Sequence, residues 1–467
     1  MHWWTLITLC VLGCNSSLRE VQEAVDQVGS KSAPASKEVT PAGGKVGPGA
    51  PNILLVSLDT VRPDHTSVYG HTNDTTPRLA HYAKQGAVFA NAYAQAPSTS
   101  PTHASMFTGL YPSTHGYYSY KYKLADKHTT LAEILRDAGY RTFGVTSSVK
   151  FVPKTGLQQG FDSFERLGGA KNGRSAQVNN KVIQLMNEDA STPFFGFVHY
   201  FDAHAPYAAP EPFRYKWHPA LSFPKPEWTS RFIKKNRRRR SIVNPIIAGY
   251  LAGLYDGELS YLDTFVDQLL AAVPQSKRRS TVVILTSDHG EAFFEHRYLG
   301  HSHVLYEEVV RVPLIVWWPD KVAAGTQIQV PTQTVDLLPT ILDFAGLPLP
   351  TGLEGRSLSE PLLGTGPEPE MTPIFLQSPK FFGLIDDLPT GRYKLTVRLK
   401  NQHPRLVNLT VDPEGKTNLA ESHPAELAAM NARMSSMPFE DPRGRSVERE
   451  EFEDSELQEL KALGYIE

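Results

Sequence analysis

Five short apolar runs separated by helical patterns are the feature that most restricts the fold of this chain. The first run, Asn52–Leu58, is apolar at nearly every position, which is typical of a strand covered on both faces in a parallel sheet. The other runs are Thr142–Val145, Phe194–Tyr200, Val282–Thr286 and Val312–Trp317, and the helical patterns are Thr76–Gly86, Leu131–Ala138, Ile246–Ala272 and Val335–Ala345. This alternation predicts an α/β domain with a mainly parallel central sheet flanked by helices.

The length of 467 residues allows a large main domain and a smaller appendage. The expected parts are a signal peptide at 1–14, a flexible tether at 15–50, the main α/β domain at 51–365 and a small C-terminal subdomain at 366–467. The tether is rich in Ser, Ala, Gly and Pro, and such a composition cannot bury a core. The C-terminal subdomain is expected to end in a charged helix, Glu448–Ala462.

The amino terminus predicts export. Its apolar run of about a dozen residues is too short to span a bilayer and has the length of a signal-peptide core. Val11-Leu12-Gly13-Cys14 resembles a bacterial lipobox, whose cysteine is lipidated after cleavage. We therefore expect a lipoprotein anchored on the periplasmic or cell-surface side of a membrane. The alternatives are a secretory signal cleaved without lipidation and an apolar start with no targeting role.

Charge and cysteine content exclude several functions. The formal net charge of −2 is no electrostatic signature for nucleic acid, so no nucleic-acid partner is expected. Both cysteines, Cys10 and Cys14, lie in the apolar start, which excludes disulfides, cysteine zinc sites and a cysteine nucleophile from the folded domain. The basic run 234–240 either meets an anionic substrate, lipid headgroups or nucleic acid, or is a solvated surface loop.

The segment Thr99–Gly109 places two hydroxyls before a proline that can open a helix. Ser100 is the expected N-cap, Pro101 the first helical residue and Gly109 the C-terminal stop. A Thr99 hydroxyl in this position faces free backbone N–H groups and the positive end of the helix dipole, which would stabilise an alkoxide or a bound anion. The alternative is an ordinary helix cap with no chemical role.

Three polar clusters follow apolar runs, namely Asp59-Thr60, Asp202-Ala203-His204 and Asp288-His289-Gly290. Because ligands bind beyond the carboxyl ends of strands in open α/β sheets, we expect these clusters to converge with the Thr99 turn. An aspartate after a strand is also a common turn residue, so the prediction depends on the clusters meeting in one place.

The converging residues are expected to bind a divalent metal ion. Asp59, Asp288, His289 and the Thr99 hydroxyl are the predicted ligands, and the imidazole favours Zn²⁺ or Mn²⁺ over Ca²⁺. The ion would lower the pKa of the Thr99 hydroxyl for attack and hold an anionic substrate oxygen.

Three further histidines are candidates for the same pocket. His103 lies one helical turn after Thr99 and is a catalytic candidate. His204 and His301 are candidates to donate to substrate oxygens or to protonate the leaving group. Such a set suits displacement at a tetrahedral anionic centre, which means a phosphate or sulfate ester.

The order of these motifs resembles the sulfatase family within the alkaline phosphatase superfamily, from Asn52 to Pro348. The matching segments are 51–65, 99–109, 204–207, 286–291, 300–301, 305–308, 311–314 and 335–340, with weaker echoes at 408–420. The resemblance implies an alkaline phosphatase/sulfatase-like fold and a metal-dependent ester hydrolase. It also implies that His204 is a substrate histidine and that His301, or its neighbour His303, stands near the family's substrate lysine.

Departures from the family pattern imply a change of chemistry. Sulfatases convert the first residue of a Cys- or Ser-x-Pro-x-Arg signature into formylglycine, whereas this sequence has Thr99 there and His103 at the arginine position. Thr60 replaces the second of two paired aspartates, and Thr146-Ser147-Ser148-Val149 lacks the Lys and His of the sulfate-binding motif. These changes point toward the threonine-nucleophile branches of the superfamily, which act on phosphate esters and phosphodiesters.

The number of metal ions also follows from the resemblance. Two-metal relatives use an Asp-x-x-x-His spacing and a further histidine, whereas this sequence offers Asp202-x-His204 and His301. Since His204 matches the family's substrate histidine better, one metal ion is expected rather than two.

The predicted function is an exported, metal-dependent hydrolase of phosphate or sulfate esters with Thr99 as its nucleophile. Phosphate monoesters, diesters or phosphonates are expected to be preferred, on an anionic small molecule or a glycan or lipid ester. One alternative is a catalytically weak sulfatase-like protein that binds sulfated or phosphorylated glycans. Another is a transferase that passes a phosphoryl group to an acceptor. The retained Asp59, Asp288 and His289 favour an enzyme over a binding protein.

Overall fold

The computed structural model describes residues 39–40, 43–119, 122–167, 174–189, 191–237, 244–437 and 458. Its main feature is an eight-stranded sheet in the order β12-β2-β11-β7-β1-β6-β4-β5. These strands are β1 (Asn52–Leu58), β2 (Ala87–Phe89), β4 (Arg141–Thr146), β5 (Ser163–Arg166), β6 (Phe194–Tyr200), β7 (Thr281–Thr286), β11 (Leu314–Trp317) and β12 (Thr326–Ile328). The central strand β1 pairs in parallel with both β6 and β7, and β11 is antiparallel to its neighbours. The predicted mainly parallel sheet is confirmed.

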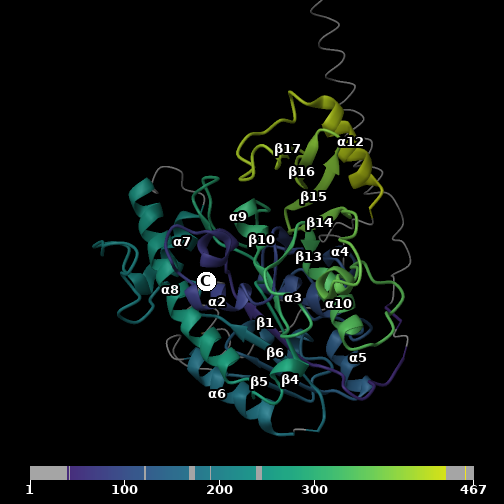
Figure 1. Cartoon of the computed structure of the whole chain (residues 1–467). Helices are drawn as coiled ribbons and strands as arrows, with labels where there is room; N and C mark the ends of the chain where they lie inside the picture. The colour runs from purple at the N-terminus through teal and green to yellow at the C-terminus, as the bar shows by residue number, and fades with distance from the viewer. Residues whose placement is uncertain are drawn as a thin grey trace, which may run out of the picture.

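Helices cover both faces of this sheet, as Figure 1 shows. The helices with eight or more residues are α3 (Thr99–Thr108), α5 (Leu131–Ala138), α6 (Arg174–Asn187), α7 (Thr229–Asn236), α8 (Pro245–Ala271), α10 (Leu337–Phe344) and α12 (Pro424–Ser435). The shorter ones are α2 (Pro77–Ala83), α4 (Pro112–His115), α9 (Glu307–Val310) and α11 (Ser359–Leu363).

The side chains of β1 alternate between two apolar cores. Leu54 and Val56 pack in one cluster with buried residues of α2, α6 and α8. Ile53 and Leu55 pack in the other cluster with residues of α3, α5 and α10. Because both faces are covered, β1 is apolar at consecutive positions from Ile53 to Val56 instead of alternating with polar residues.

A small C-terminal subdomain lies at the top of the view in Figure 1. Its antiparallel sheet has the order β14-β15-β16-β17. The strands are β14 (Ile374–Gln377), β15 (Phe381–Leu388), β16 (Gly391–Arg398) and β17 (Pro404–Asn408). Met430 and Met434 of α12 pack in the same apolar cluster as Leu384 and Leu395 of this sheet. The predicted helix Glu448–Ala462 lies outside the described residues except for residue 458.

The predicted strand Val312–Trp317 is divided in the structure. Pro313 interrupts it, because proline has no N–H to donate to a strand ladder. Residues Arg311–Val312 form β10, which joins β3 (Ala92–Tyr93) and β13 (Thr332–Gln333) in a three-stranded sheet. The short pair β8 (Ala292–Phe293) and β9 (Leu299–Gly300) forms a separate hairpin.

The described part of the predicted tether lies against the main domain. Thr40 bridges to Thr351, Val39 is buried, and the N–H of Val46 donates to the carbonyl of Ala138 over 3.1 Å. The signal peptide and Cys14 lie outside the described residues, so export and lipidation stay predictions. Among the described helices, none combines the length and the apolar content needed to cross a membrane.

The central strand should dominate the stability of the fold. Leu55→Ala removes a fully buried side chain, and we expect it to lower the free energy of unfolding by about 2–5 kcal/mol through lost burial and a residual cavity. The measurement is the midpoint of urea unfolding. Leu349→Ala is the matched control, because Leu349 is 40% exposed and should change the midpoint little. Equal effects of the two substitutions would contradict the assignment of β1 to the core.

Candidate functional site

The candidate site lies where β7, β1 and β6 reach their carboxyl ends. Ser57 of β1 pairs with His199 of β6 on one side and with Thr286 of β7 on the other. Asp59 follows β1 and Asp288 follows β7, so both carboxylates reach the same edge as His199. The predicted convergence of strand ends is therefore present.

Asp59, Asp288 and His289 come together as the sequence predicted. All three are fully buried, and their ligand atoms lie within 4.8 Å of one another. Nδ1 of His289 is 2.9 Å from the Gly290 carbonyl and must donate to it, so the neutral tautomer of this ring carries its lone pair on Nε2. That Nε2 lies 3.5 Å from Asp288 Oδ2, which has no hydrogen-bond partner among the described residues. Two acceptors facing each other fit a bound cation.

The Asp288 carboxylate is held in its ionised form. The N–H groups of Thr60 and His289 donate to its Oδ1 over 3.1 and 2.9 Å. Burial opposes ionisation, but the imidazoles of His289, His103 and His199 together with the Thr60 N–H lower the pKa of Asp288 to about 2. Thr60 donates from a left-handed conformation, with φ 60°. The residue that replaces the second of the paired aspartates thus positions Asp288.

Thr99 begins helix α3, two residues earlier than the proline that was expected to open it. Ser98, with extended backbone, is the N-cap, so the prediction of Ser100 as the cap is wrong. Pro101 is tolerated in the first turn because the N–H groups there have no partner within the helix. The helix ends at Gly109, as predicted, with φ 66°. The Thr99 Oγ1 lies 3.4 Å from His289 Nε2, which places the hydroxyl beside the Asp59, Asp288 and His289 group.

His103 lies beneath the site and does not line the cleft described below. Its Nδ1 donates to the Thr99 carbonyl over 2.8 Å, and its Nε2 accepts from the Ser57 hydroxyl over 2.9 Å. Burial lowers its pKa, which favours the neutral ring. The rings of Phe151 and Phe197 contact it, and a ring nitrogen of His103 lies within 4.8 Å of ligand atoms of His199 and Asp288. Its contacts suit positioning of the Thr99 turn.

His204 and His301 lie side by side, with ring centroids 5.1 Å apart. Each donates through Nδ1, His204 to the Ala205 carbonyl over 2.6 Å and His301 to Glu291 Oε1 over 3.0 Å. In the neutral form, each Nε2 is therefore an acceptor, and donation to a substrate requires the imidazolium. Burial, with nearby positive charge, lowers the pKa of His301 well below its usual value.

A cleft of about 410 Å³ opens beside Thr99. The described residues that line it are Ser98, Thr99, Ser100, Pro101, Tyr118, Ser119, Lys150, Lys234, Arg237, His301, Ser302, His303 and Pro379. Three of these are cationic side chains, and none of the described lining residues is acidic. The described end of the basic run 234–240 thus lies at the cleft, which favours an anionic ligand.

Sequence reasoning missed three residues of the site. Lys150 lines the cleft, but it lies one position beyond the segment in which a lysine was sought. The sequence does not show in which direction its side chain points. His199 faces Asp59 over 3.5 Å but stands within an apolar strand, where a histidine carries no motif. Glu291 follows the Asp288-His289-Gly290 cluster and accepts from both His301 and the Tyr207 hydroxyl over 3.0 Å. Its place directly after the predicted metal ligands Asp288 and His289 was the available signal.

Two family models match the chain. The model described as "Sulfatase" matches residues 51–347, and the model described as "N-sulphoglucosamine sulphohydrolase, C-terminal" matches residues 290–437. Among curated proteins, the chain is similar to an ulvan-active sulfatase of Formosa agariphila, with 26% identity over 73% of this chain and 71% of that protein.

Solved structures share the fold. A phosphonate monoester hydrolase of Agrobacterium radiobacter superposes with a TM-score of 0.66 and 21% identity, over 83% of this chain and 94% of that one. A second structure, in complex with its substrate D-glucosamine-2-N,6-O-disulfate, has a TM-score of 0.66 and 19% identity, over 85% and 99% of the two chains.

Metal removal should reveal the repulsion between the buried carboxylates. In chelator, we expect Asp59→Asn to unfold at a higher temperature than wild type, by about 1 °C for each kcal/mol of repulsion relieved. In excess Zn²⁺ or Mn²⁺ the order should reverse, because the wild type alone keeps the full ligand set. Thermal unfolding of both proteins measures this. Asp137→Asn, at an exposed carboxylate, is the control. The same order of stability under both conditions would contradict a cation site at Asp59.

Proposed function

The chain belongs to the sulfatase family and is a hydrolase of sulfuric or phosphoric esters, and we propose that the Thr99 hydroxyl is its nucleophile. We further propose that phosphate monoesters, diesters or phosphonates are the preferred substrates. The observation that carries this proposal is the position of Thr99 Oγ1, which lies 3.4 Å from His289 Nε2 and also lines the cationic cleft.

Asp59, Asp288 and His289 would hold the divalent ion, and their facing acceptor atoms fit such a ligand. A bound Zn²⁺, Mn²⁺ or Ca²⁺ would supply Lewis acidity at the Thr99 hydroxyl and at a substrate oxygen. The proposal includes one ion, because among the described residues neither His204 nor His301 belongs to a group of candidate metal ligands.

The protein side chains supply the remaining steps. The Thr99 hydroxyl releases its proton to water, its oxygen attacks phosphorus to form a new O–P bond, and the bond to the leaving alcohol breaks. Lys150 and Arg237 bind the anionic oxygens of the substrate in the cleft. His204 rather than His301 protonates the leaving oxygen, because burial and nearby positive charge lower the pKa of His301 well below its usual value. Water then hydrolyses the phosphothreonine and restores the hydroxyl.

The nucleophile decides between phosphate and sulfate. Both cysteines of the chain, Cys10 and Cys14, precede the described residues, so no cysteine lies where formylglycine would be formed. Without the hydrated aldehyde, the attacking group is an alkoxide that forms a stable ester to phosphorus, which water can later attack. This argument favours phosphate, although the relatives include both sulfatases and a phosphonate monoester hydrolase.

We propose an anionic glycan or lipid ester as the natural substrate class. The cationic lining of the cleft supports this choice, as do relatives that are named for ulvan or bound to a disulfated glucosamine. Export with a lipid anchor on Cys14 would place the enzyme where such polymers and lipids occur, and it stays part of the proposal.

The nucleophile can be tested by substitution at Thr99. Thr99→Ala should lower kcat/KM for an aryl phosphate by about 10³-fold or more, because it removes the attacking oxygen. Thr99→Ser should keep measurable turnover. The assay compares aryl phosphate, bis-aryl phosphate, aryl phosphonate and aryl sulfate with added Mn²⁺ or Zn²⁺. Thr108→Ala is the matched control, since that hydroxyl on the same helix donates to the Ala104 carbonyl.

The outcomes separate the candidate functions. Turnover that survives Thr99→Ala would refute the nucleophile assignment. Sulfate turnover above phosphate turnover would refute the preference. Binding of a sulfated or phosphorylated glycan without turnover would favour the binding-protein alternative, and product formed only with an acceptor alcohol would favour a transferase.

The basic end of α7 should govern substrate binding. Arg237→Ala should raise KM for the anionic ester about 5- to 100-fold with a smaller effect on kcat, because it removes a charge-assisted contact to the substrate. Arg231→Ala is the control on the same helix, where the side chain is exposed and does not line the cleft. Steady-state kinetics at fixed ionic strength measures both. An unchanged KM in Arg237→Ala would exclude this residue from substrate binding.

A further inference from the structure

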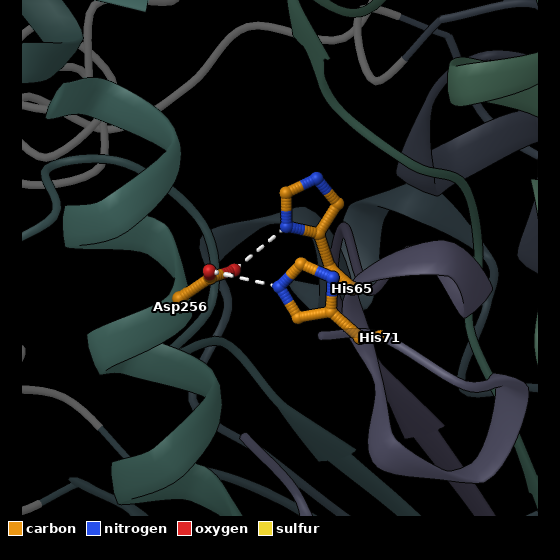
Figure 2. A group of neighbouring side chains, drawn as sticks. All are labelled: His65, His71 and Asp256. Atoms are coloured by element: carbon orange, nitrogen blue, oxygen red, sulfur yellow. Dashed lines mark hydrogen bonds and ion pairs between the residues drawn. The ribbon is translucent and has the colours of Figure 1, made fainter. Parts of the chain in front are cut away.

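A second group of metal-ligating side chains lies outside the cleft, where the segment after β1 meets the middle of α8. Figure 2 shows His65 and His71 directed at the two oxygens of the Asp256 carboxylate. His65 Nδ1 lies 2.6 Å from Oδ1, and His71 Nε2 lies 3.0 Å from Oδ2. The two imidazole rings are 4.8 Å apart between centroids. The reaction proposed above uses none of the three residues.

The geometry of this group suits a small cation. The three ligand atoms lie within 4.8 Å of one another, and they come from two segments far apart in the sequence. The Asp256 side chain is 3% exposed, whereas His65 and His71 are 12% and 16% exposed. The carboxylate is thus enclosed while the imidazoles reach solvent, which gives an ion a path to the site. Asn73 Nδ2 also donates to Asp256 Oδ2 over 2.9 Å and orients the carboxylate.

We propose that His65, His71 and Asp256 bind Zn²⁺. Two imidazole nitrogens and one carboxylate oxygen form a ligand set that suits zinc, with water at the fourth tetrahedral position. A set with two nitrogens is poorly suited to Ca²⁺ or Mg²⁺, which take oxygen ligands. This inference does not rest on the chemistry proposed for Thr99.

Zinc would replace the two protons that now join the imidazoles to the carboxylate. Each neutral ring moves its proton to the other ring nitrogen, from Nδ1 to Nε2 in His65 and from Nε2 to Nδ1 in His71. The freed lone pairs then bind the ion, and a ring that carries two protons releases one of them. Tetrahedral bonds near 2.0 Å require the nitrogen and oxygen atoms to separate to roughly 3.3 Å, a small movement of partly exposed rings.

The ion would fasten the segment that follows Asp59 to α8. Tyr255, beside Asp256, already joins the two: its hydroxyl donates to the Thr60 carbonyl over 2.8 Å and accepts from the Arg62 N–H over 2.9 Å. Zinc at His65 and His71 would add a second attachment a few residues along the same segment. We therefore infer a stabilising ion rather than a second catalytic one.

The test counts zinc in the full chain after the catalytic ligands are removed. Asp59→Asn combined with Asp288→Asn, stripped with chelator and titrated with Zn²⁺ alone, should still bind one zinc ion per chain. Addition of His71→Gln should weaken this binding at least about tenfold. His81→Gln, at an exposed histidine of α2, is the matched control and should leave the zinc ion in place.

Two further measurements keep the test independent of folding failure. Zinc should raise the unfolding temperature of the double variant and of the His81→Gln control, but not that of His71→Gln. Co²⁺ should give the visible absorption of a tetrahedral site in the first two proteins only. Circular dichroism checks that each variant is folded. If His71→Gln does not fold, His65→Gln replaces it in the same measurements. Absence of zinc from the double variant, or equal affinity after His71→Gln, would overturn the proposal and leave a hydrogen-bonded His–Asp–His group.

Discussion

The pairing of β1 with β6 and β7 is the constraint on which the rest of the site depends. Its register sets Ser57 opposite His199 and Thr286, so Asp59 and Asp288 emerge at one edge of the sheet. Both faces of β1 are covered by apolar cores, which fixes the register because a slip by one residue would exchange the two faces. The site therefore inherits its geometry from the most buried part of the protein.

Burial of charge explains the surroundings of this edge. Carboxylates withdrawn from water need N–H donors, imidazoles or a cation nearby. Thr60 and His289 supply backbone donors to Asp288, and the Gly290 carbonyl fixes the ring orientation of His289. Gly290 is required there, since a Cβ at this position would lie 2.2 Å from the Glu308 carbonyl oxygen. These contacts leave Asp288 Oδ2 and His289 Nε2 facing each other over 3.5 Å.

Sequence motifs predicted the residues whose position follows from the end of a strand. They did not predict the exact start of helix α3 or the residues whose place depends on side-chain direction. The residues after β1 and β7 converged as expected, because parallel strands end at one edge. Ser98 replaced Ser100 as the cap, since a proline fits several positions of a first helical turn. Lys150 lines the cleft, although it lies one position beyond the segment in which a lysine was sought. Residue propensities determine neither where this helix begins nor which side chains reach the cleft.

The sequence by itself determined the α/β class, the family resemblance and the candidate set of Asp59, Thr99, Asp288 and His289, because apolar periodicity and motif order are local properties of the chain. Only the tertiary structure decided that His199 and Glu291 join this neighbourhood, that His103 lies beneath it and that the basic segment reaches the cleft. These placements depend on contacts between segments up to a few hundred residues apart. Packing and the burial of charge select such contacts, and no local pattern in the sequence records them.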